Sequence, residues 1–294
     1  MDRKGVLESR TLPDPEFEKL WDRIFLPDET KTRIVSQILL EFTMRGKLDR
    51  GAVPLHGVIL LTGPPGTGKT SFAKAAASKA AHILRRTIRY LAAEPHGLTS
   101  SSLGKTQRAV RDFLHSTVAE TASNGPLIIL LDEVETLAAS RARMSFDANP
   151  IDVHRATDAL LAGLDVLAEE YPHLLFIATT NFEGAIDEAF LSRADLVEYI
   201  GKPDRKACRE ILVDTLSVMA EQWPEIQEIP KTPGFEAVVD LAVGLDGRQI
   251  RKIVLQACTL EKELAINPGL LKLEHLERVL AKAKKLRSVR EVAA

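Results

Sequence analysis

Apolar runs alternate with helical patterns over the first two thirds of the chain. Between the runs, apolar residues recur at helical spacing over residues 69–81, 103–120 and 151–169. Strands that are apolar throughout and separated by helices indicate a parallel sheet covered on both faces. We therefore predict an α/β fold with five parallel strands, at Gly57–Thr62, Ile88–Ala92, Leu127–Asp132, Leu174–Thr180 and Leu196–Ile200.

The segments on either side of this pattern differ from it. Residues 1–15 are polar and contain prolines, so we predict that they are flexible. Two amphipathic helices are expected next, near residues 17–25 and 30–44. After residue 203 the strand signals stop and only helical patterns remain. We expect an α/β domain over residues 1–201 and a small all-helical domain over residues 202–294.

The turn after the first predicted strand is Gly63-Pro64-Pro65-Gly66-Thr67-Gly68-Lys69-Thr70, which matches the P-loop pattern G-x-x-x-x-G-K-[ST] at every fixed position. Its glycines let backbone N–H groups approach phosphate oxygens. Lys69 is expected to reach the β- and γ-phosphates, and the Thr70 hydroxyl to bind Mg²⁺. A glycine-rich turn without a ligand has no need for that lysine, so we predict a nucleotide site.

Two acids, Asp132 and Glu133, end the third predicted strand. A buried parallel strand delivers Asp132 to the carboxyl edge of the sheet, where it can hold Mg²⁺ beside the phosphates. Glu133 is expected to point to the other side of the strand and to activate the attacking water. Apolar strands that end in an acid are common, so this motif gains its weight from the P-loop upstream.

Three more polar residues are candidates for the same site. Asn181 follows the fourth predicted strand, where it either contacts the γ-phosphate or the lytic water, or caps a turn. Arg193 precedes the last strand, where it either reaches a neighbouring subunit's γ-phosphate or pairs locally with Asp187 or Asp195. Arg248 opens a predicted helix and either folds over the phosphates of its own subunit or is solvated.

Taken in this order, the motifs resemble those of the AAA+ ATPases, over roughly residues 17–287. The resemblance assigns Walker A to Gly63–Thr70, Walker B to Asp132 and Glu133, sensor 1 to Asn181, the arginine finger to Arg193 and sensor 2 to Arg248. The short Ser192-Arg193-Ala194-Asp195 segment and residues 131–141 and 244–252 resemble the pachytene checkpoint protein 2 group. Members of that group are hexameric remodellers of HORMA-domain proteins, and bacterial members act in antiphage systems with a cyclic-oligonucleotide synthase.

The resemblance implies a homohexamer that uses ATP and Mg²⁺. Because no apolar run has the length of a membrane span and no apolar signal core follows Met1-Asp2-Arg3-Lys4, we expect a cytoplasmic protein. Its expected partner is a HORMA-domain protein, alone or bound to a cyclic-oligonucleotide synthase. The chain resembles the short bacterial form, since the P-loop position leaves no room for the adaptor-binding domain of eukaryotic members. The expected substrate-gripping pore loop has no aromatic residue and offers His96, Gly97 and Leu98 instead. A second pore loop is expected near Met144-Ser145-Phe146, and an adenine pocket near residues 24–26.

Charge and composition narrow the alternatives. With 39 Lys and Arg against 41 Asp and Glu, the chain has a formal net charge of −2 and no overall attraction to nucleic acid. This counts against the alternative of a DNA-directed AAA+ protein, such as a clamp loader or helicase loader. Glu133 counts against a non-catalytic scaffold. Cys208 and Cys258 lie far apart and predict neither a disulfide framework nor a zinc site, and no apolar run is long enough to span a membrane.

Overall fold

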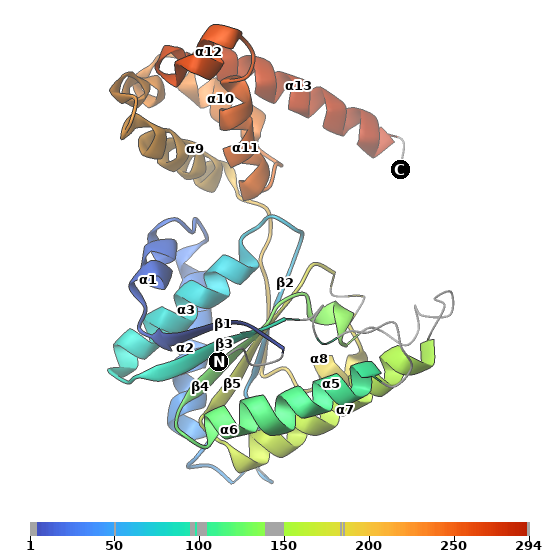
Figure 1. The fold of residues 1–294 in the computed structure, drawn as a ribbon. Coiled ribbons are helices and arrows are strands. Elements are labelled where there is room, and N and C mark those ends of the chain that lie inside the picture. Colours follow the sequence, from blue (N-terminus) through green and yellow to red (C-terminus); the bar gives the residue numbers. More distant parts are fainter. Residues whose placement is uncertain are drawn as a thin grey trace. The chain divides into compact units, whose positions relative to one another are not determined.

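The computed structural model describes residues 5–49, 51–94, 98, 105–138, 150–182, 184 and 186–292. The chain divides into two compact units (Figure 1). The first comprises Met1–Pro64 and Lys69–Ile200, and the second comprises Pro65–Gly68 and Gly201–Ala294. The second unit thus resumes at Gly201, where the strand signals in the sequence stop.

A six-stranded sheet forms the centre of the first unit (Figure 1). Its strands are β1 (Val6–Leu12), β2 (Val58–Thr62), β3 (Ile88–Ala93), β4 (Leu127–Leu131), β5 (Leu174–Thr180) and β6 (Leu196–Tyr199). They lie in the order β1-β3-β4-β5-β2-β6, with β1 antiparallel to β3 and the other neighbours parallel. The five predicted parallel strands are confirmed, and the structure adds a sixth.

Strand β1 lies in the segment predicted to be flexible, and that prediction is wrong for residues 6–12. The strand pairs with β3 along its length, so backbone hydrogen bonds hold it. Its side chains carry little strand signal, because only Leu12 is buried while Leu7 is 68% exposed. After β1, the Asp14 side chain accepts N–H bonds from the first turn of the next helix and so fixes where that helix begins.

Helices cover both faces of the sheet (Figure 1). One face is covered by α1 (Pro15–Asp22), α2 (Asp28–Met44) and α3 (Lys69–Leu84). The other is covered by α5 (Lys105–Asp112), the π-helix η1 (Phe113–Val118), α6 (Ala119–Ala122), α7 (Pro150–Glu170) and α8 (Glu188–Leu191). Strand β4 shows why its sequence is continuously apolar: Ile128 and Leu130 pack on the first layer, whereas Leu127, Ile129 and Leu131 pack on the second.

The described part of the second unit after Gly201 is helical. Its elements are α9 (Arg205–Ala220), η5 (Pro224–Lys231), α10 (Phe235–Ala242), α11 (Gly247–Ala257), α12 (Lys262–Ile266), η6 (Pro268–Leu270) and α13 (Leu273–Val292). Asp246 and Gln249 form a reciprocal capping box that fixes the start of α11. Across the described ranges of the whole chain, none of the helices combines the length and apolarity needed to cross a membrane.

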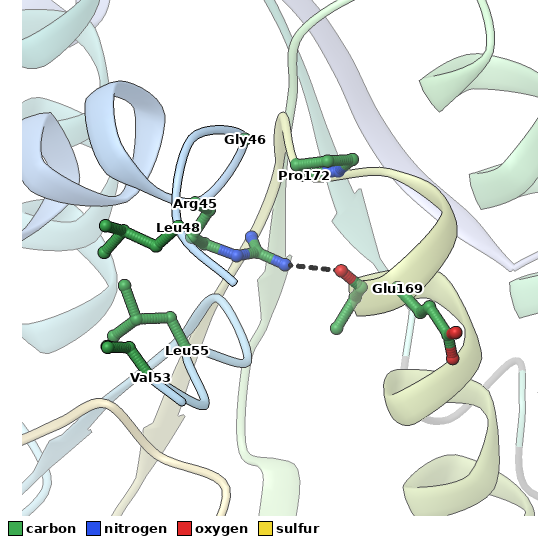
Figure 2. Close-up of a pocket in the computed structure, with 8 residues that line it drawn as sticks. Arg45, Gly46, Leu48, Val53, Leu55, Glu169 and Pro172 are labelled. Carbon is green, nitrogen blue, oxygen red and sulfur yellow. Dashed lines mark hydrogen bonds between the residues drawn. The ribbon is translucent and has the colours of Figure 1, made fainter. Parts of the chain in front are cut away.

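A buried ion pair lies at the edge of the sheet where the parallel strands begin. Arg45 follows α2 and donates a hydrogen bond to the carbonyl oxygen of Leu174. It also donates to the carbonyl oxygen of Ala168 at 3.2 Å, the bond drawn as a dashed line in Figure 2. Its Nε lies 3.7 Å from Oε2 of Glu41, one helical turn earlier, and both side chains are almost fully buried. Arg45 therefore joins the end of α2 to the start of β5 and the end of α7, with Glu41 beside it.

Asp195 anchors the start of β2 at the same edge. Its carboxylate accepts the backbone N–H groups of His56 at 3.0 Å, Gly57 at 2.5 Å and Val58 at 2.9 Å. The last residue of the Ser-Arg-Ala-Asp segment thus has a structural role, because it orders the chain that enters β2.

We expect Glu41 to make stability depend on pH. Burial, with the nearby charge of Asp195, raises the pKa of Glu41 from 4.5 to about 7, against the opposing effects of Gln37 and Arg45. Between these two pH values the folded chain holds a proton that the unfolded chain has lost, so this group lowers stability as pH rises through that window. The Glu41→Gln variant lacks this loss, so its free energy of unfolding relative to wild type should increase over the same window. Urea unfolding at about pH 5 and about pH 8 measures the difference, and a difference that does not change with pH would contradict the raised pKa.

Candidate functional site

The P-loop connects β2 to α3 at the carboxyl edge of the sheet. Gly63, Gly66 and Gly68 have φ angles of 142°, 81° and 92°, which residues with a side chain rarely adopt. A Cβ on Gly63 would lie 2.1 Å from the carbonyl oxygen of Ile200. The loop therefore needs these glycines for its path as well as for close approach to a ligand.

Lys69 turns back over this loop. Its side chain is buried, and Nζ donates to the carbonyl oxygens of Gly63 at 2.8 Å and Pro64 at 2.9 Å, and to Oδ1 of Asn181 at 3.0 Å. All three partners are neutral oxygens. Burying an ammonium costs free energy that a bound anion offsets, so Lys69 is suited to hold a phosphate group.

Asp132 gathers two hydroxyl groups beside the P-loop. Its Oδ1 accepts from Thr70 Oγ1 at 2.8 Å and from Thr179 Oγ1 at 2.5 Å. The Thr179 hydroxyl oxygen in turn accepts the backbone N–H of Glu133 at 3.1 Å. Thr179 was not among the residues predicted from the sequence. Its position near the end of β5, next to the strand that Asp132 follows, could have indicated a contact with Asp132.

Glu133 reaches the site by a different route from the one predicted. Strand alternation predicts that its side chain points away from that of Asp132. Strand β4 ends at Leu131, and Glu133 adopts a left-handed conformation with φ 51° and ψ 52°. The exposed side chain accepts a hydrogen bond at Oε1 from Nδ2 of Asn181 at 3.2 Å. A left-handed turn, and not the strand, therefore sets its direction.

Asn181 connects the two sides of this cluster. Its Oδ1 accepts from Lys69 and its Nδ2 donates to Glu133, while its backbone N–H donates to Oε1 of Glu135 at 3.2 Å. Glu135 is a second residue that the sequence analysis missed. One amide side chain thus joins the ammonium of the P-loop to the carboxylate predicted to act as a base.

Arg193 makes its side-chain contacts elsewhere in the first unit. Its guanidinium pairs with Asp165 of α7 through two hydrogen bonds, and it also donates to the carbonyl oxygen of Ala189. The hydrogen bonds to Asp165, with the charges of Asp165 and Asp187, hold the pKa of Arg193 above its ordinary value against the opposing effect of partial burial. The ion-pair partner is Asp165, whereas the local alternative named Asp187 or Asp195, and the role of Arg193 at a neighbouring subunit stays a prediction.

The other predicted site residues are Arg248 and those of the two pore loops, and the structure describes only some of them. Arg248 is exposed in the first turn of α11, and its backbone N–H donates to the carbonyl oxygen of Gly66, which belongs to the same unit, at 3.3 Å. His96, Gly97 and the predicted second pore loop lie outside the described residues. Leu98 is only 2% exposed and packs in the core, and its role of gripping substrate stays a prediction.

Comparison with known proteins identifies the family. The profile of the ATPase family associated with various cellular activities (AAA) matches residues 59–202. CD-NTase-associated protein 6 of Pseudomonas aeruginosa is 50% identical to this chain over 285 residues, which cover 97% of this chain and 94% of that protein. The chain belongs to the AAA ATPase family.

Relatives with lower sequence identity are homologues of pachytene checkpoint protein 2. Pachytene checkpoint protein 2 homologues of Xenopus tropicalis and Arabidopsis thaliana are 32% and 34% identical over 212 and 209 residues. The matches cover 70% and 68% of this chain but 48% and 44% of those proteins, so the chain spans about half their length. The resemblance to the pachytene checkpoint protein 2 group is confirmed.

Two solved structures have the same fold. The structure of Caenorhabditis elegans PCH-2 matches with a TM-score of 0.74 and 23% identity, over 98% of this chain and 78% of that one. A chain in the structure of the HORMA:CdnC:Trip13 complex of Escherichia coli MS115-1 matches with a TM-score of 0.75 and 19% identity, over 94% of this chain and 95% of that one.

The residues at the carboxyl edge of this AAA sheet fit a magnesium nucleotide. A glycine loop allows backbone N–H groups to approach phosphate closely, and Lys69 supplies a buried cation. Asp132 and Thr70 supply the oxygen ligands that Mg²⁺ prefers, in number suited to an ion that keeps several waters. We therefore keep Gly63–Thr70 as the predicted phosphate site and Thr70 with Asp132 as the predicted metal ligands.

We expect Thr179 to support magnesium binding. Thr179→Val keeps the side-chain volume but removes the hydroxyl that links the Asp132 carboxylate to the Glu133 backbone. The affinity for a fluorescent ATP analogue in the presence of Mg²⁺ should fall about tenfold, the value of one hydrogen bond to a charged group. Thr43→Val, which makes the same change at an exposed position of α2, should bind as wild type does. Equal magnesium-dependent affinity in the two variants would contradict the role of Thr179.

Proposed function

We propose that this AAA family member is an ATP-driven remodeller of HORMA-domain proteins in a bacterial antiphage system. The observation that carries the proposal is the 50% identity, over 97% of the chain, with a protein named for its association with a CD-NTase. The fold shared with a chain of a HORMA:CdnC:Trip13 complex supports the choice of partner. The partner is a HORMA-domain protein, alone or bound to its cyclic-oligonucleotide synthase.

The proposed site binds ATP through the P-loop. Backbone N–H groups of Gly63–Thr70 and the ammonium of Lys69 would hold the phosphates. Thr70 and Asp132 would hold Mg²⁺. The bound nucleotide supplies the γ-phosphoryl group that is transferred to water.

Glu133 is the proposed general base. Its exposed carboxylate can accept a proton from water at Oε1 or Oε2, and the hydrogen bond from Asn181 Nδ2 fixes the direction of the side chain. Because Asn181 also bonds to Lys69, a displacement of that ammonium toward phosphate alters the partner of Glu133. Asn181 can thereby couple occupancy of the P-loop to the position of the base.

The proposed active form is a homohexamer in which Arg193 of one subunit acts at the nucleotide of the next. A guanidinium placed there stabilises the negative charge that develops during phosphoryl transfer. The helical second unit and the exposed Arg248 at the start of α11 are proposed to respond to the nucleotide of their own subunit. Such coupling would convert hydrolysis into motion of the loops that engage the HORMA protein.

The proposal predicts disassembly of a HORMA complex that depends on hydrolysis. We expect the wild-type protein to separate a purified bacterial HORMA-domain protein from its CD-NTase when ATP is present, but not when ADP is. Glu133→Gln should still bind nucleotide, yet lose on the order of a hundredfold or more in hydrolysis and release no partner. Size-exclusion chromatography of the mixture measures the release.

Two results would contradict the proposal. Disassembly by Glu133→Gln at the wild-type rate would show that hydrolysis at this residue is not required. ATPase activity that rises with DNA and not with the HORMA complex would favour the DNA-directed alternative.

A further inference from the structure

Arg193 and Asp165 form a two-point ion pair in the first unit. Nε of Arg193 donates to Oδ1 of Asp165 at 2.8 Å, and Nη2 donates to Oδ2 at 2.7 Å. The partners are 28 residues apart, on α7 and just after α8. A carboxylate that meets one edge of a guanidinium in this way fixes both the plane of the group and its rotation.

A third bond holds the same guanidinium from its own turn. Nη1 of Arg193 donates to the carbonyl oxygen of Ala189 at 2.7 Å. This turn is rigid, because the Asp187 side chain accepts the Ala189 N–H at 3.0 Å and Phe190 is completely buried. The guanidinium is therefore supported from two elements that are themselves packed against the core.

The three bonds do not use all the N–H groups of the Arg193 guanidinium. A guanidinium has five N–H groups, and the bonds to Asp165 and Ala189 use three of them. Up to two N–H groups, on Nη1 and Nη2, can meet an incoming oxyanion while the edge that carries Nε stays on Asp165. The Arg193 side chain is 22% exposed and that of Asp165 40%, so another subunit can approach the pair.

We propose that Asp165 is a positioning residue that holds the Arg193 guanidinium ready for a phosphate oxygen of the neighbouring subunit. The inference rests on the proposed function, in which Arg193 acts in the neighbouring site. Holding the group before it is needed avoids the entropy cost of ordering a long side chain during the reaction. A carboxylate that instead withheld the arginine would have the opposite effect, since its removal would speed hydrolysis.

The test measures steady-state ATP hydrolysis by the full chain, at a protein concentration high enough that the rate per subunit no longer rises with it. Asp165→Asn keeps the side-chain shape but removes the charge and one acceptor, so kcat should fall about tenfold while KM for ATP stays within about twofold. Asp165→Glu keeps the carboxylate, displaced by one methylene, so its kcat should lie between those of wild type and Asp165→Asn. Glu170→Gln removes one charge at an exposed position of the same helix and should leave both constants unchanged.

A double-mutant cycle separates this role from a structural one. If Asp165 acts through Arg193, then Asp165→Asn combined with Arg193→Ala should have the same kcat as Arg193→Ala alone. An additive loss, a kcat raised by Asp165→Asn, or a lower kcat for Asp165→Glu than for Asp165→Asn would overturn the inference. A wild-type kcat for Asp165→Asn beside a reduced one for Arg193→Ala would overturn the inference and leave the proposed function standing. A wild-type kcat for Arg193→Ala would instead count against the proposed function.

Discussion

The parallel register of three neighbouring strands is the constraint on which the rest of the site depends. Strand β5 pairs with β2 and β4 so that Thr62 lies opposite Thr180 and Leu131 opposite Ala178. The residues that follow each strand therefore meet at one edge of the sheet: the P-loop after β2, Asp132 after β4 and Asn181 after β5. A shift of one residue in either pairing would separate these groups and reverse the faces of the strands.

Hydrogen bonds then organise the polar groups that the register brings together. Thr179 holds the Asp132 carboxylate to the backbone of Glu133, and Asn181 holds Lys69 to the side chain of Glu133. Lys69 donates to carbonyl and amide oxygens, whereas the acids accept from hydroxyl and amide donors. Preorganised donors of this kind are suited to stabilise negative charge at the edge of the sheet.

The sequence predicted what regular patterns encode, namely the five parallel strands, the helical layers and the motif residues at the strand ends. It did not predict what depends on backbone pairing or distant contacts. Strand β1 is held by hydrogen bonds to β3, and the left-handed turn at Glu133 has no side-chain signature. Asp165 lies 28 residues from Arg193 in the sequence, so no local pattern connects the two. Leu98 is buried by residues from distant segments, and the sequence around it does not show this contact.

The central claim is that each nucleotide site is completed by the arginine of a neighbouring subunit. The most direct test mixes two inactive variants, Arg193→Ala with an intact base and Glu133→Gln with an intact arginine. Rings that contain both should regain ATP hydrolysis, because some sites then combine a wild-type Glu133 with a wild-type Arg193 from the next subunit. Hydrolysis that stays at the level of the separate variants, in rings shown to contain both, would contradict the account.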